Sequence, residues 1–410
     1  MKRIISVLIC SLLLSVNFSQ VSSAANKAGG SCKRINENAT SGSAKLICLK
    51  SGKKLIWVNR ADITAFAYGP TGRLVYRYVA GKQERQSLYK DWIKSDSRGE
   101  KSFDPIRVAA YKSIRDLKID PSHSNIEFEY LIRPSYPKEI ADVIKLQSVE
   151  FAKRLSPLLD KKLPIKLILV TEKDRAYVDS QFPSIVPNQD WQMLFDLFAD
   201  YVTLERFYSR SGTGGGTAAY LPEKGYGYYI GHTSSLAKLN TYWPEVAPHE
   251  MTHVMQAVLA NGFGGEYGEG DPRAKWHGHL IEGSANTFGM ALGFDQLGWY
   301  SDEMDVLLKN NIRAYKSTYP MRNIDDALFL VKEIEKRDTQ ARGELSYGAG
   351  QFVWEYFVGK YGADKFIELL RNVPKTQSFD QNIKQTIGIE KSEFYKAAAE
   401  YLLTAWKRLS

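Results

Sequence analysis

The residues with the clearest chemical potential form the pentapeptide His-Glu-Met-Thr-His at residues 249–253. On a helix this spacing places two imidazoles one turn apart on the same face, where both can bind one metal ion. Glu250 then lies beside them and can accept a proton from a metal-bound water. Apolar residues recur around the pentapeptide at three- and four-residue steps, and Pro248 suits the first turn of a helix. This segment therefore predicts a helical metal site with its own general base.

A catalytic zinc site also needs a third protein ligand and one open position. Glu282 is the best candidate, because it stands in the segment 277–286, where the small residues 283–285 would let a second helix approach the first. His279, one helical turn before Glu282, is the alternative third ligand, or else contacts a ligand or the substrate. Four of the six histidines fall between His249 and His279, and this clustering favours a metal.

The two segments resemble the gluzincin peptidases, which are HExxH metallopeptidases with a distant glutamate ligand. The resemblance is strongest to a secreted bacterial branch that carries the motifs HExxHxxQ and EGxA, here residues 249–256 and 282–285. It extends over about residues 126–403. It implies an α+β, zincin-like fold in which a small sheet lies over the HExxH helix and a helical lobe follows.

The activity that the resemblance implies is peptide-bond hydrolysis. A Zn²⁺ ion would be held by His249, His253 and Glu282, Glu250 would serve as catalytic base, and a peptide or protein would be the substrate. In relatives a tyrosine that opens a later helix can stabilise the oxyanion, and Tyr347 is the matching position; a packing role is its alternative. No segment like the GxMEN of the aminopeptidase branch is present, so an endopeptidase is expected.

A different class of function also fits the same residues. A secreted binding or scaffold protein could keep the zincin fold and use the metal as a structural part. A purely structural site has no need of Glu250, which argues for the enzyme.

The first residues have the order of a secretory signal. Lys2 and Arg3 precede an apolar run at residues 4–14, and small residues lead to expected cleavage near Ala24 or Ala25. The apolar run is shorter than the roughly 20 residues of a spanning helix, so no stable membrane span is expected. These features predict a secreted or extracytoplasmic protein with a signal peptide at residues 1–25.

Export leaves two cysteines, Cys32 and Cys48, and an oxidising compartment favours a disulfide between them. We therefore expect a small N-terminal appendage and linker at residues 26–103, followed by the catalytic domain at residues 104–410. The net charge of +9 is scattered along the chain, with no basic stripe interleaved with aromatic residues, and this excludes nucleic-acid binding.

The catalytic domain is expected to begin with strands and to end with helices. Alternating apolar residues from residue 126 to 132 predict a strand, residues 138–155 a helix, and the apolar run 163–171 a second strand. We interpret the glycine-rich residues 211–217 as a flexible loop. The aromatic strand at residues 226–230 is placed to pair with an extended peptide at the edge of the sheet.

Overall fold

The computed structural model is a mixed α+β structure, which agrees with the expected fold class at that level. The predicted signal segment at residues 1–25 lies outside the described part of the chain. Residues 191–207, whose sequence predicts a helix, also lie outside it. Within that part, no helix has the length and apolar character needed to cross a membrane. The structure describes residues 27–34, 37–51, 54–59, 65–68, 74–79, 82–83, 98–186, 214–237, 239, 243–262 and 276–410.

A small antiparallel sheet forms near the N-terminus, from β1 (Asn38–Ser41), β2 (Ala44–Ser51) and β3 (Lys54–Asn59). The predicted disulfide between Cys32 and Cys48 is confirmed, with Cα atoms 5.8 Å apart. It fastens the segment before β1 to β2, so that this small unit depends less on a hydrophobic core. A second three-stranded sheet follows, made of β4 (Ala65–Tyr68), β5 (Leu74–Val79) and β6 (Lys82–Gln83).

The main sheet has four strands in the order β7-β8-β10-β9. The strands β7 (Ile126–Ile132), β8 (Leu163–Thr171) and β10 (Tyr226–Thr233) run parallel, and β9 (Gly214–Leu221) closes one edge in the antiparallel direction. The run of apolar residues in β8 is explained by its central position, because a strand between two neighbours and covered on both faces has no polar side. The predicted strands at residues 126–132 and 163–171 are confirmed.

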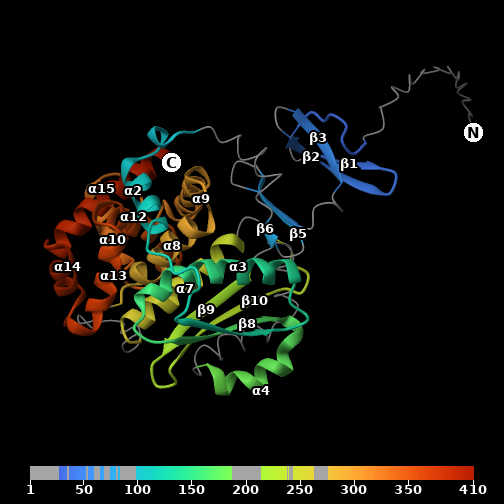
Figure 1. Cartoon of the computed structure of the whole chain (residues 1–410). Helices are drawn as coiled ribbons and strands as arrows, with labels where there is room; N and C mark the ends of the chain where they lie inside the picture. The colour runs from blue at the N-terminus through green and yellow to red at the C-terminus, as the bar shows by residue number, and fades with distance from the viewer. Residues whose placement is uncertain are drawn as a thin grey trace, which may run out of the picture.

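Helices cover both faces of this sheet (Figure 1). One face packs on α3 (Lys138–Leu155) and α7 (Trp243–Leu259), through side chains such as Leu167 and Leu169 of β8. The opposite face packs on α4 (Arg175–Ile185). Because side chains along β8 alternate between the two faces, the core has one part on each side of the sheet. Helix α7 packs on the side of Leu167 and Leu169.

Two expectations about this sheet were wrong. Residues 214–217 belong to β9 and not to a loop, since they pair with β10. Glycine stands at 214–216 because neighbouring groups leave no room for a side chain: a Cβ on Gly214 would lie 2.3 Å from the His232 carbonyl oxygen. The strand at residues 226–230 is part of β10, which hydrogen-bonds to β8 on one side and β9 on the other. It has no free edge for a peptide, and β9 is the edge strand.

The C-terminal part is helical and packs around α12 (Gly350–Tyr361). Helix α2 (Pro105–Arg115), which precedes the main sheet in the sequence, also packs on α12. Its buried Arg107 donates two hydrogen bonds to the fully buried Glu355 of α12. Helix α8 (Ser284–Gly293) of this lobe packs directly against α7. The elements of the lobe are η6 (His279–Gly283), α8 (Ser284–Gly293), α9 (Leu297–Tyr315), α10 (Ile324–Glu333), α11 (Gln340–Gly348), α12 (Gly350–Tyr361), α13 (Ala363–Asn372), α14 (Phe379–Ile387) and α15 (Lys391–Leu409).

Candidate metal centre

The pentapeptide lies in the middle of α7, so His249 and His253 project from one face of the helix. The helix starts at Trp243, more than a turn earlier than expected, and Pro248 is therefore inside it rather than in its first turn. Burial of Trp243 explains the extension, since its side chain packs in the core. The two Nε2 atoms lie 3.1 Å apart and face the same point.

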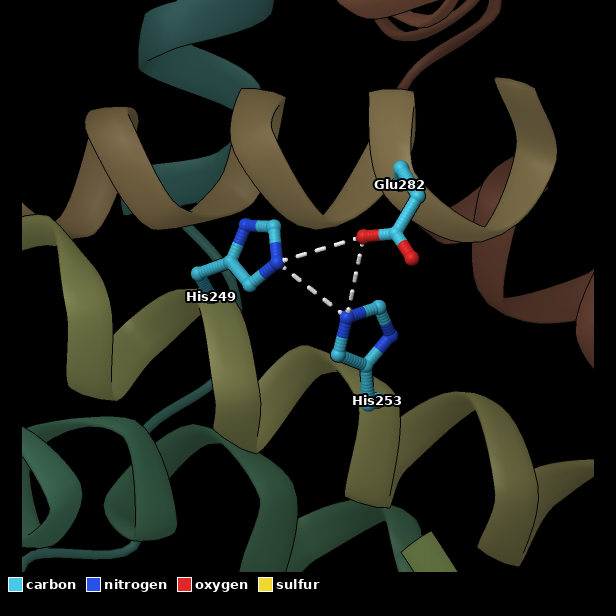
Figure 2. Close-up of side chains that lie close together, drawn as sticks. All are labelled: His249, His253 and Glu282. Carbon is cyan, nitrogen blue, oxygen red and sulfur yellow. Dashed lines mark hydrogen bonds and ion pairs between the residues drawn. The ribbon is translucent and has the colours of Figure 1, made fainter. Parts of the chain in front are cut away.

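Glu282 reaches this point from a second element, η6, which is a π-helical turn leading into α8. Its Oε2 atom lies 3.5 Å from the Nε2 atom of His249 and 3.5 Å from that of His253 (Figure 2). These three residues form the one group of potential metal ligands of this size within the described residues, with all ligand atoms within 4.8 Å of one another. π-Helical turns are rare and frequently stand at functional sites.

Glycines bring the two ligand-bearing helices into contact. A Cβ on Gly289 of α8 would lie 3.0 Å from the Cβ of His249, and one on Gly293 would lie 2.7 Å from the Pro244 carbonyl oxygen. Gly283, which follows the ligand, instead packs on the backbone of Gly350 in α12. The expected close approach of the two helices is therefore achieved further along α8 than the residues 283–285.

Gln256 connects the two ligand-bearing elements. Its Oε1 atom lies 2.9 Å from the Nδ1 atom of His253, and its amide nitrogen donates to the carbonyl oxygens of Leu280 (3.3 Å) and Ile281 (2.9 Å) and to the Ser284 hydroxyl (2.8 Å). Because an amide oxygen can only accept, His253 donates from Nδ1 and keeps the lone pair of Nε2 for the cluster.

Glu250 lies on the sheet side of the cluster. A Cβ on Gly216 of β9 would come within 2.5 Å of the Glu250 Oε1 atom, so the carboxylate rests against the strand backbone. Its Oε2 atom is buried and has no hydrogen-bond partner. Burial raises the pKa of Glu250, and Glu282 adds to the increase, although His249 and His253 act in the opposite direction. A raised pKa suits a group that accepts a proton and passes it on.

Glu282 has the opposite electrostatic environment. Burial alone would raise the pKa of Glu282, but His253, His249 and Arg337 together lower it well below its usual range. The pKa of Glu250 is therefore raised and that of Glu282 lowered, so Glu282 is the one that stays an anion. The two carboxylates beside the histidines therefore differ in how readily each takes up a proton.

Tyr347 lies at the site, as expected, but in a different structural setting. Its ring is stacked on His249, with centroids 5.9 Å apart and planes at 10°. It belongs to the last turn of α11 and does not open a helix, because α11 already begins at Gln340. Burial, followed by the nearby Glu282 carboxylate, raises the pKa of Tyr347 well above 10, so the phenol stays protonated and can donate.

The other histidines lie away from this cluster. His279 is fully buried, and its ring accepts from Trp354 Nε1 at 3.2 Å and bonds the Tyr395 hydroxyl at 2.8 Å. Both of its ring nitrogens are therefore occupied, which leaves Glu282 as the third candidate ligand. His277 faces Glu335, with Nδ1 3.7 Å from Oε2. His232 lies in β10.

Arg337 was missed by the sequence analysis. It lies between α10 and α11, and its Nη1 atom is 2.5 Å from Oε1 of Glu282. A single arginine in a connecting segment has no spacing or neighbouring motif that would single it out. Only the packing of that segment against η6 brings it to the site.

Comparisons of the chain with protein families, with curated proteins and with solved structures gave no match. Two imidazole nitrogens and one carboxylate oxygen converge from two helices, with a second carboxylate and a protonated phenol beside them.

Proposed function

We propose that this chain is a zinc-dependent peptidase with a zincin-like fold and a gluzincin ligand set. The observation that carries the proposal is the convergence of His249, His253 and Glu282 next to Glu250, whose buried Oε2 atom has no hydrogen-bond partner. A site that only needed to bind a structural metal would have no use for that second carboxylate.

The donor atoms fit zinc in type and in separation. Ligands held tetrahedrally at about 2.0–2.2 Å from zinc lie about 3.3–3.6 Å from one another. The three separations here, 3.1, 3.5 and 3.5 Å, are close to that range. The Oε2 atom of Glu282 is buried and lacks a hydrogen-bond partner, as is expected of a group whose partner is a cation. Three protein ligands would leave one position for water or substrate.

Zinc at this site would supply a Lewis acid for the scissile carbonyl and would acidify a bound water. Glu250 would take a proton from that water on its Oε2 atom and deliver it to the leaving amine. Tyr347, stacked on His249 and protonated, would donate a hydrogen bond to the oxyanion that forms on the carbonyl oxygen.

We assign the substrate backbone to the outer edge of β9, in place of β10, because β9 pairs only with β10 among the described strands. Adding a strand to this edge would run an extended peptide past Gly216, where the missing side chain leaves the Glu250 carboxylate against the backbone. Binding along a strand suits an endopeptidase. We also propose an extracytoplasmic location, which the disulfide between Cys32 and Cys48 supports.

The test is the variant Glu250→Gln. An amide cannot accept a proton from water, so we expect peptide hydrolysis to fall by at least ~10²-fold while zinc content and fold are kept. The assay is cleavage of a mixed peptide library by the zinc-loaded protein, with mass spectrometry of the products. Unchanged turnover would sink the peptidase mechanism and favour a binding or scaffold protein with a structural metal.

A further inference from the structure

Arg337 is held over the ligand-bearing turn by its surroundings. The backbone N–H of Gly278 donates to the Glu335 carbonyl at 2.7 Å, and that of His279 donates to the Ile334 carbonyl at 3.0 Å. Gly278 is needed for this arrangement, because a Cβ there would lie 2.6 Å from the Cγ atom of Arg337. The arginine stem therefore crosses the backbone just before η6 and points its guanidinium at Glu282.

The two oxygens of Glu282 consequently have different partners. Oε1 lies 2.5 Å from Nη1 of Arg337, whereas Oε2 is the atom nearest both imidazoles. Only 6% of the Glu282 side chain is exposed, against 29% for Arg337. Water therefore has little access to the carboxylate, and an ion pair in such a place is only weakly screened.

A carboxylate can bind a cation through one oxygen or through both. When both oxygens of Glu282 are free, a bound ion can take both and so lose its open coordination position. When Oε1 is engaged by a guanidinium, only Oε2 is offered. The contact of Arg337 with Glu282 thus affects whether a bound ion keeps the free coordination position that catalysis needs.

We propose that Arg337 is a positioning residue that restricts Glu282 to one ligand oxygen and thereby keeps a coordination position open. This inference rests on the metal site proposed above. It assigns to the connection between α10 and α11 a part in the chemistry that no motif in that segment indicates.

The test replaces zinc by Co²⁺, whose visible absorption is strong with four ligands and several times weaker with five. Arg337→Met keeps a stem of similar length and removes every donor. We expect the wild-type chain to give the intense four-ligand spectrum and Arg337→Met to lose most of that intensity. Gly278→Ala, which pushes the arginine aside, should cause the same loss if Arg337→Met does not fold.

The matched control is Arg342→Met. Arg342 pairs with Glu333 and Asp338 on either side of the same connection, away from the metal ligands. Its variant should keep the wild-type spectrum, with the melting temperature measured for both. An unchanged spectrum in Arg337→Met, or an equal change in Arg342→Met, overturns the proposal.

The result is independent of peptidase activity. If the wild-type chain binds Co²⁺ but cleaves no peptide, the proposed enzyme fails and the spectra still decide the role of Arg337. If it binds no Co²⁺, the metal site and this proposal fail together.

Discussion

The most informative perturbation outside the ligands themselves is Gln256→Leu. Gln256 is fully buried, and it is the side chain that hydrogen-bonds both to His253 and to the carbonyls of Leu280 and Ile281 just before Glu282. Leucine has a similar volume and can make none of these bonds. The substitution therefore removes the side-chain hydrogen bonds between α7 and η6 and keeps a side chain of similar volume in the core.

The expected cost in stability can be worked from the partners left behind. The Leu280 carbonyl still accepts from the Ser284 hydroxyl, and the Ile281 carbonyl still accepts from the Ser284 backbone N–H. Only the Nδ1–H of His253 loses its acceptor, and a buried donor left unpaired costs about 1–3 kcal/mol. We expect the metal-free protein to lose about 2 kcal/mol of unfolding free energy.

The expected cost in metal binding is separate. Without Gln256 the His253 ring can rotate or change tautomer, and loss of such a supporting hydrogen bond typically weakens metal binding by about 10–100-fold. This corresponds to about 1.4–2.8 kcal/mol of binding free energy. Competition against a chromophoric chelator measures the zinc dissociation constant, and urea unfolding in excess chelator measures the stability.

Gln351→Leu is the matched control. Gln351 is also a fully buried helical glutamine, but its amide donates to the Met304 carbonyl at 2.9 Å and forms no hydrogen bond with a candidate ligand. It should lose stability and keep its zinc affinity. If Gln256→Leu binds zinc as tightly as the wild type, or if both variants weaken zinc equally, Gln256 does not orient His253 and the reasoning is refuted.

Three further outcomes are expected. His253→Ala and Glu282→Ala should each lose zinc by elemental analysis while His279→Ala retains it, and the reverse pattern would show the wrong third ligand. Tyr347→Phe should lower kcat by roughly 10² with unchanged zinc content, whereas lost stability with kept activity would make it a packing residue. Burial and neighbouring Asp302 raise the pKa of Glu303 from 4.5 to about 8, so its stabilising contribution, present below pH 4.5, is lost as pH rises towards 8. The decline in unfolding free energy is worth about 1.4 kcal/mol per pKa unit at most, and Glu303→Gln should abolish it. Urea unfolding of the metal-free protein at several pH values measures it, and an unchanged pH profile in the variant would contradict the shift.

Much of the sheet and its neighbours could be predicted because their patterns are local. The helix predicted at residues 138–155 coincides with α3, and the apolar run at residues 163–171 coincides with β8. Apolar spacing with a period of 3.6 or an unbroken apolar run reports which faces of an element are buried, without any knowledge of the partner. The disulfide was predictable for a similar reason, since two cysteines allow one pairing.

The glycine-rich segment shows where such reasoning fails. Glycine disfavours strands by its own propensity, which is why residues 211–217 predict a loop. In the structure Gly214, Gly215 and Gly216 are strand residues whose missing side chains make room for Trp243, His232 and Glu250. The reason for these glycines is thus tertiary, and it becomes visible only when α7 lies over β9.

The same distinction holds for the chemistry of the site. The residues on α7 carry a recognisable spacing, whereas Arg337 is brought in by contacts between distant segments. A carboxylate as buried as Glu282 needs cationic or hydrogen-bonding partners, and Arg337 is one of them beside His249 and His253. Among the described residues at the site, two carboxylates, Glu250 and Glu282, accompany one guanidinium. The one negative charge left over would attract a cation, so the electrostatics of the site and the spacing of its donors both favour a metal ion.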